Sequence, residues 1–187
     1  MLNRDFLLQF KKTTESSWSQ QSINPAAYGF QFQLGTRWNP GLSTAEIEEY
    51  ENAVGMHFPL DFRAFLHVMN GTDVPTLNVY GHCGEPHRTS VGFYSYPRDL
   101  KIVEQRIEDV RESRNEIAAD LKEQGFDLSS HADLVPIFGH RYVVCTSNLN
   151  SSVVLSIVVH DVDAIVYGNS LEEYLEREFL NRPPERV

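Results

Sequence analysis

The stretch WNPGLSTAEIEEYENAVGMHFPLDFRAFLHVMNG, residues 38–71, decides the fold, because signals for helix start, helix period and helix end agree within it. Ser43 followed by Glu46 predicts a capping box, in which the hydroxyl accepts from the backbone N–H three residues on and the carboxylate accepts from the Ser43 amide. Apolar residues then recur at helical spacing: Ile47, Tyr50 and Val54. Gly55 predicts the end of this first helix.

A second short helix is predicted to follow at once. Pro59 suits its first turn, where a missing N–H costs nothing. The apolar residues after it fall on one helical face: Phe62, Phe65, Leu66 and Met69. Asn70 and Gly71 are predicted to end this helix. The two helices therefore form a corner with apolar faces, and we expect a sheet from later in the chain to cover them.

This stretch resembles the SUKH superfamily, the fold of many bacterial toxin-immunity proteins and of the yeast cell-wall-assembly-regulator family. The residues that carry the resemblance are caps, turns and core positions: Trp38, Asn39, Gly41, Leu42, Ser43, Glu46, Glu51, Gly55, Pro59, Phe62, Arg63, Phe65, Leu66, Asn70 and Gly71. The ending YGNSLEEYL, residues 167–175, is a second match and contains another predicted capping box, Ser170 with Glu173. None of these residues is typical of a catalytic site.

The composition describes a soluble globular domain. The chain has 187 residues, of which 41% are hydrophobic and 22% charged. Its formal net charge of −10 argues against nucleic-acid binding and permits a basic protein partner. No apolar run reaches the length of a membrane span, and the N-terminal residues do not resemble a signal peptide, so we expect a cytoplasmic protein. Cys83 and Cys145 form no C-x-x-C pair.

Outside the organising stretch, the patterns predict further elements. Asn3 caps a helix that runs to about Ser16, and alternation predicts a strand at residues 30–34. Two more strands are predicted at 77–80 and 91–96, with a loop between them. A long helix then runs from Asp99 to Glu123, with a narrow apolar stripe and a wide charged face. Strands are predicted at 134–138, 142–145, 153–159 and 164–167, with a hairpin turn at 148–151.

Together these patterns predict an α+β single domain, with a mixed or mainly antiparallel sheet of about six strands covered by helices. We expect residues 1–37 to hold the N-terminal helix and strand. Residues 38–180 are then the SUKH-like core, with the long charged helix at about 98–124 as an elaboration of it. Residues 181–187 form a tail.

The sequence offers little for catalysis. His82, Cys83 and His87 are the best candidates for metal ligands, but only the two histidines have suitable spacing, so an ordinary loop is the preferred interpretation. No nucleophile elbow or glycine-rich phosphate loop is present. We therefore predict that the protein is not an enzyme and has neither a metal nor a cofactor.

The resemblance implies a protein that binds another protein. The leading hypothesis is a bacterial immunity protein that neutralises a basic toxin domain such as a nuclease, and the alternatives are a regulatory module of the cell-wall-regulator kind and an enzyme or metalloprotein built on the His82 loop. Exposed aromatic and acidic side chains furnish the candidate contact regions: Tyr80, Tyr94, Tyr96, Glu104, Glu108 and Glu112. The three glutamates are four residues apart, on one face of the long helix. The sequence does not indicate an oligomeric state.

Overall fold

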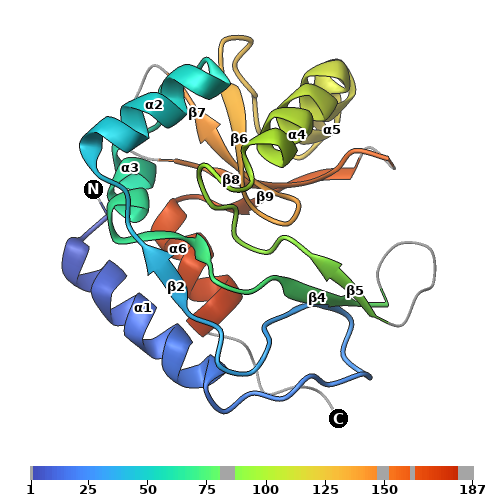
Figure 1. The fold of residues 1–187 in the computed structure, drawn as a ribbon. Coiled ribbons are helices and arrows are strands. Elements are labelled where there is room, and N and C mark those ends of the chain that lie inside the picture. The colour runs from blue at the N-terminus through green and yellow to red at the C-terminus, as the bar shows by residue number, and fades with distance from the viewer. Residues whose placement is uncertain (1, 81–86, 147–151, 161–162, 181–187) are drawn as a thin grey trace.

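The computed structural model describes residues 2–80, 87–146, 152–160 and 163–180 (Figure 1). In chain order its elements are α1 (Arg4–Trp18), β1 (Gly29–Gln31), β2 (Trp38–Pro40), α2 (Thr44–Val54), α3 (Leu60–Val68), β3 (Met69–Thr72), β4 (Thr76–Val79), β5 (His87–Ser90), α4 (Leu100–Glu112), α5 (Arg114–Glu123), β6 (Asp133–Phe138), β7 (Arg141–Cys145), β8 (Val154–Val158), β9 (Asp163–Gly168), α6 (Leu171–Leu175) and the π-helical turn η2 (Glu176–Leu180). The predicted α+β class is confirmed. The strands form three antiparallel sheets, in the orders β1-β4-β5, β2-β3 and β6-β7-β8-β9.

The four-stranded sheet is buried on both faces. Its side chains alternate with the pleat, so the paired residues Val135 and Val143 face one hydrophobic cluster while Leu134 and Val144 face another. Continuous β-branched runs in the sequence reflect this double burial. The four strands predicted at the C-terminal end are confirmed, and the predicted turn at 148–151 lies outside the described residues.

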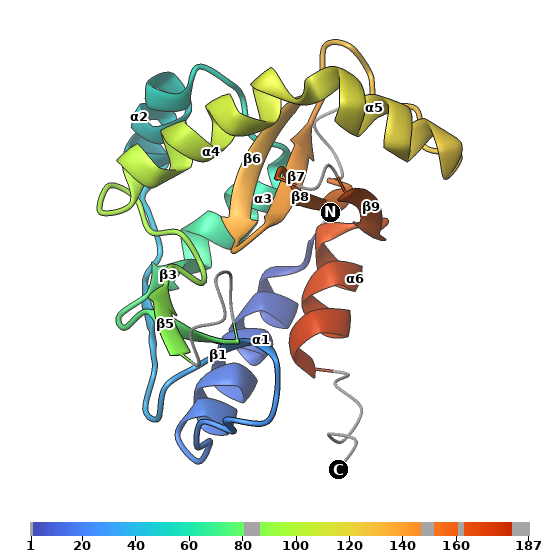
Figure 2. The ribbon, with the colours of Figure 1, turned by 90° about the vertical axis from the view of Figure 1, so that its right-hand side faces the viewer.

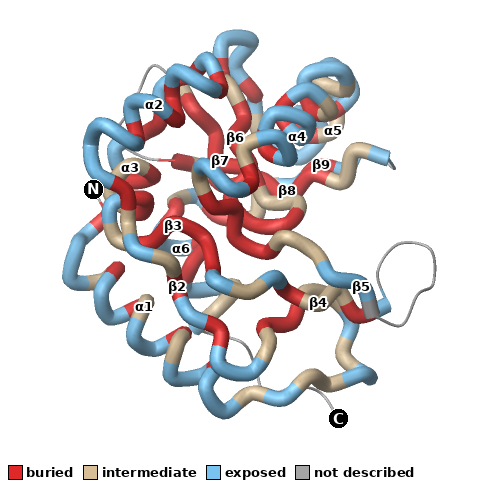
Figure 3. The backbone as a smooth tube through the Cα atoms, in the orientation of Figure 1, coloured by how far each residue is buried: buried red, intermediate tan, exposed pale blue. Residues whose placement is uncertain are grey.

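The helical corner covers the first face of this sheet, as predicted (Figure 3). The capping box of Ser43 and Glu46 is present, and Gly55 ends α2 with a positive φ of 70°. Helix α3 ends at Val68, earlier than predicted, because the residues that follow continue as β3 and pair with β2. At Gly41 a Cβ atom would lie 2.0 Å from the carbonyl oxygen of His67, so only glycine allows this close approach of the two segments.

The second face of the sheet is covered by α4 and α5, which cross in front of β6 and β7 in Figure 2. The predicted long helix is therefore two helices, with Ser113 between them at φ −94° and ψ 14°. The buried stripe of these helices packs on the sheet: Val110, Ile117 and Leu121 lie in one cluster with Leu155 and Ile157. Removing α4 and α5 would expose that face.

The strand predicted at 91–96 is wrong. The strand after β4 is β5, and within 91–96 the backbone forms only an isolated bridge between Phe93 and Phe138. The Phe93 ring lies 4.4 Å from the ring of Trp38 and 4.7 Å from that of Phe138, measured between centroids. The Asn70 side chain holds Tyr96 by two backbone hydrogen bonds, of 2.7 and 2.8 Å. Packing against distant residues, not strand pairing, places this segment.

The first and last helices, α1 and α6, pack against the same core. Asn3 caps α1 as predicted, and the helix continues to Trp18. In the second predicted capping box, the Ser170 hydroxyl accepts from the Glu173 N–H, but the Glu173 carboxylate accepts from the N–H of Asn169. The N–H group that the Glu173 carboxylate binds is therefore one residue earlier in the chain than predicted. No helix in the described ranges is both long and apolar enough to cross a membrane.

Candidate functional site

Two of the three tyrosines predicted to contact a partner belong to the core. Tyr94 is only 7% exposed, and its hydroxyl donates to the carbonyl oxygen of Gly139 at 2.7 Å, so it is not the exposed side chain that we expected from the sequence. Tyr96 is half-buried and stacks on Tyr50, with the ring centroids 4.7 Å apart. Both rings therefore pack mainly against core residues and not on the surface.

Tyr80 is exposed and forms a surface pair with Tyr28. The two rings lie 4.7 Å apart, and the side chains are 44% and 78% exposed. Pairing of Gly29 with Val79 between β1 and β4 brings the two tyrosines together. The sequence did not indicate Tyr28, because it follows a turn-rich segment and its neighbour in space is distant in the chain. Exposed tyrosine rings of this kind are typical of contact surfaces.

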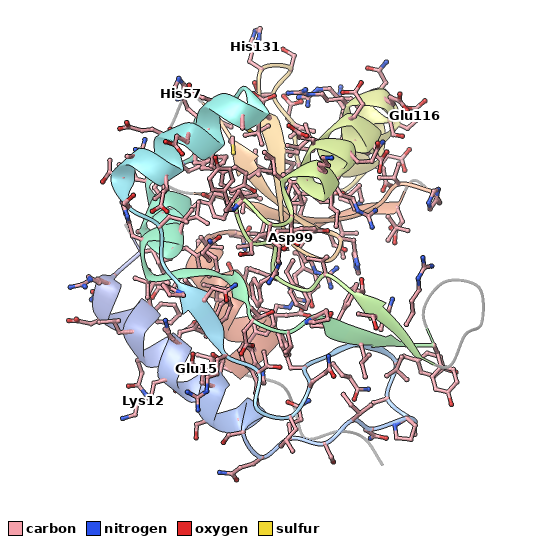
Figure 4. All side chains as sticks on the ribbon, in the orientation of Figure 1. Lys12, Glu15, His57, Asp99, Glu116 and His131 are labelled. Atoms are coloured by element: carbon pink, nitrogen blue, oxygen red, sulfur yellow. The ribbon has the colours of Figure 1, made fainter. Side chains whose placement is uncertain are left out.

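The acidic side chains predicted on the long helix all lie on α4 and point away from the core. Glu104, Glu108 and Glu112 are exposed, and none forms an ion pair with another residue in the described ranges. Buried residues on the opposite side anchor the helix: Val103, Ile107 and Val110. The acidic side continues onto α5, where Glu116 points outward in Figure 4. The packing of the helix on the core thus fixes where these carboxylates are presented, on a helix that also exposes Lys101, Arg106 and Arg111.

A groove of about 740 Å³ lies beside this acidic helix. One wall is the side of α4 that carries Ile102, Arg106, Asp109 and Glu112. Residues of β5 form the opposite wall: Arg88, Thr89 and Ser90. The turn at Gly139 and His140 and the end of β8 close it. Of the six sequence-predicted contact residues, Tyr94 and Glu112 line this groove, while Tyr80, Tyr96, Glu104 and Glu108 do not.

The ring side chains of His140 and Tyr94 line the groove, and both are uncharged at neutral pH. Burial, with the nearby charges of Arg141 and Arg106, lowers the pKa of His140 to about 4, so its imidazole is uncharged at neutral pH. Burial also raises the pKa of Tyr94, although the Arg106 guanidinium opposes the shift. His140 and Tyr94 are therefore uncharged hydrogen-bonding groups at neutral pH, and the charges of the groove belong to other lining residues: Arg88, Arg106, Asp109 and Glu112. The sequence did not single out Arg106 and Ile102 as groove residues. Only Ile102 gives a signal in the sequence, because it is an apolar residue that lies off the apolar stripe of the helix.

Among the described residues, no metal cluster is present and the free cysteine is buried. These residues contain no cluster of three or more His, Cys, Asp or Glu side chains arranged to hold a metal ion. Cys145 is buried in β7, and burial raises the pKa of its thiol, which keeps it protonated and unreactive. Of the predicted metal candidates, His82 and Cys83 and the side chain of His87 lie outside the described residues.

Comparison with known families places most of the chain in one family. The model of the SMI1/KNR4 family (SUKH-1) matches residues 41–177 of the 187-residue chain. This range runs from the start of the helical corner, through the acidic helices and the four-stranded sheet, into the last helical turns. No curated protein shows significant sequence similarity to the chain.

Proposed function

Because the chain belongs to the SMI1/KNR4 family (SUKH-1), we propose that it is a non-enzymatic protein-binding domain and acts as an immunity protein, which binds and neutralises a basic bacterial toxin domain. It does so in the cytoplasm, by stoichiometric binding and without turnover. One observation carries the proposal: α4 presents exposed carboxylates that have no ion-pair partner within the described residues, on a helix fixed to the core. The charges that a basic partner would meet are already in place before binding.

The acidic surface favours a basic partner for a kinetic reason. A net charge of −10 attracts a positively charged protein over distances comparable to the Debye length, which raises the association rate. Raising the salt from roughly 0.1 M to 1 M shortens that length from about 10 Å to about 3 Å. Association with the partner is therefore expected to slow steeply over this range of salt.

The exposed pair of Tyr28 and Tyr80 supplies a second contact region. Tyrosine contributes a large contact area at a small cost in side-chain entropy, and it is enriched in the centres of interfaces. The two rings already contact each other at an interplanar angle of 37°, so binding would not have to bring them together. We assign it the apolar part of the interface and assign the rim charges to α4.

The test begins with the gene beside the one that encodes this chain, since immunity proteins are usually encoded next to their toxins. Expression of the neighbouring product alone should stop growth, and co-expression with this chain should restore it. Purified proteins should form a one-to-one complex. If the neighbouring product is harmless, or if it remains toxic and unbound in the presence of this chain, the proposal is wrong.

Charge reversal then tests the surface. The triple variant Glu104→Lys, Glu108→Lys, Glu112→Lys should slow association and weaken its salt dependence, with an unchanged melting temperature because all three side chains are exposed. The control variant Glu49→Lys, Asp127→Lys, Glu176→Lys makes the same change in net charge with exposed residues away from α4. Equal effects of the two variants would mean that net charge matters and that α4 is not the contact surface.

A further inference from the structure

Side chains block the open edge of the four-stranded sheet. At β9, the N–H of Ala164 donates to the carboxylate of Asp120 at 2.7 Å, and Gln124 donates to the Ala164 carbonyl oxygen at 2.6 Å. Further along the strand, Arg177 donates to the carbonyl oxygen of Tyr167 at 3.0 Å. These side chains occupy the positions that a neighbouring strand would take. Edges treated in this way do not pair with other chains.

Neighbouring segments also lie beside β6 and β1 in the larger sheets. Beside β6, the N–H of Tyr94 donates to the Ile137 carbonyl oxygen at 3.3 Å, and that of Gly139 donates to the Gly92 carbonyl oxygen at 3.0 Å. Beside β1, the segment 24–27 is tied to the Gln31 side chain by three hydrogen bonds.

The outer edge of β5 is free within the described residues. Its backbone pairs with β4 on one side, and no backbone or side-chain group in the described ranges hydrogen-bonds to its other side. In an antiparallel pair, alternate residues turn their N–H and C=O groups outward, so part of the β5 backbone points away from β4. The β5 residues Arg88, Thr89 and Ser90 also line the groove of about 740 Å³ beside α4. An unblocked edge beside a groove is the arrangement that β-strand addition requires.

The charges of the groove indicate what enters it. On the α4 wall, Asp109 and Glu112 attract a basic side chain, and the net charge of −10 disfavours a second copy of this chain. Two cations also line the groove, Arg88 on β5 and Arg106 on α4, and they would repel a uniformly basic segment. A segment that carries one basic residue among neutral ones satisfies both conditions. The groove volume falls within the usual range of binding pockets, about 300–1,000 Å³.

We propose that an extended segment of the protein partner adds to β5 as a fourth strand of the β1-β4-β5 sheet and fills the groove, with one Lys or Arg side chain directed at Asp109 and Glu112. This inference rests on the proposed function and states how the partner is held. Backbone pairing supplies affinity, and the groove selects the side chains that alternate along the added strand. The acidic outer side of α4 steers the partner toward this place.

Amide hydrogen exchange tests the mode of binding, with the purified product of the neighbouring gene as the probe. Its addition should slow exchange at outward-facing amides among Arg88, Thr89 and Ser90 by at least about tenfold, since strand pairing protects them. The amide of Ala164 serves as the internal control, because Asp120 already holds it in the free protein. Complex formation without protection at β5 would overturn the inference and leave the proposed function standing.

A variant that fills the groove gives a second measurement. Ile102 is 43% exposed and lines the groove, so Ile102→Trp should leave the fold intact and weaken binding by at least about tenfold, or about 1.4 kcal/mol. Leu8→Trp is the matched control, since Leu8 is 45% exposed on α1 and outside the groove. Equal affinities of the two variants would overturn the inference. Protection of β5 that rises with protein concentration in the absence of the probe would also overturn it, in favour of a second copy. A probe that does not bind at all removes the proposed function and this inference with it.

Discussion

Replacement of Phe65 by alanine tests whether the helical corner organises the core. The side chain lies on α3 and is 2% exposed. Three aromatic rings surround it, those of Trp38, Phe62 and Phe93, with centroids 5.9, 6.1 and 6.0 Å away. The Trp38 ring meets it edge-on, at an interplanar angle of 84°. These neighbours are large and held by other contacts, so they can relax only partly into the space that alanine would leave.

The expected loss in the free energy of unfolding is the sum of two terms. Returning a fully buried aromatic side chain to water costs about 1.5–3 kcal/mol, and the residual cavity adds about 24 cal/mol for each Å³ that is not refilled. Phe65→Ala should therefore lower the free energy of unfolding by about 3–5 kcal/mol. Phe65→Leu retains most of the volume and should cost clearly less.

Denaturant unfolding measures the effect, provided that the slope of free energy against denaturant stays constant among the variants. Leu60→Ala is the control because Leu60 lies on the same helix but is 38% exposed, and its cost should stay below about 1 kcal/mol. If Phe65→Ala cost no more than Leu60→Ala, the aromatic cluster around α3 would not carry the stability that its burial implies.

Three smaller predictions follow from single contacts. Ser43→Ala removes the α2 cap, in which the hydroxyl accepts from the Glu46 N–H, and should lower the free energy of unfolding by about 1 kcal/mol; a neutral result in the same denaturant assay would contradict this. The pKa of His140 is about 4 in the folded protein and near 6.5 when unfolded, so the unfolded chain binds more protons between these values. The contribution to stability is therefore complete above about pH 6.5 and is lost as the pH falls toward about 4; His140→Gln should make the unfolding midpoint less pH-dependent over this range, and an unchanged dependence would refute the assignment. The double variant Asp120→Ala, Gln124→Ala uncovers the β9 edge at Ala164 and should promote concentration-dependent association in sedimentation experiments, whereas a monomer at all concentrations would show that α5 shields the edge without these side chains.

The features that the sequence predicted well are those that neighbouring residues determine. The cap at Asn3, the box of Ser43 and Glu46 and the left-handed residue Gly55 all depend on groups within a few positions in the chain. The side chains of Asn3, Ser43 and Glu46 bind backbone groups of their own helices, so packing against distant residues changes these caps little. The strands at the C-terminal end were predictable for another reason, since both of their faces are buried and the β-branched runs are long.

The predictions from sequence failed where residues that are distant in the chain determine the local structure. The alternation around Tyr94 is typical of a strand, yet the Tyr94 hydroxyl bonds to Gly139 and Phe93 fills space between Trp38 and Phe138. Both a strand and an aromatic core segment place rings at every second residue, so the pattern alone did not distinguish them. For the same reason the exposed pair of Tyr28 and Tyr80 could not be predicted, because it exists only through the register of β1 with β4.

The break between α4 and α5 at Ser113 could not be predicted from the apolar pattern. The apolar stripe of α4 continues into α5 with a seven-residue step from Val110 to Ile117, which suits an unbroken helix equally well. The break is associated with contacts that the stripe does not encode: Arg114 donates to the carbonyl oxygen of Ser129 at 2.7 Å, and α5 reaches the edge of β9.

Helices α4 and α5 therefore present two different sides. Their buried residues and edge-covering side chains complete the sheet, while Glu104 and Glu108 on the outer side remain without ion-pair partners in the described ranges. Deleting the helices would unfold the domain and could say nothing about binding. Only changes confined to the exposed carboxylates, compared with an equal charge change elsewhere, separate the role in packing from the proposed role in recognition.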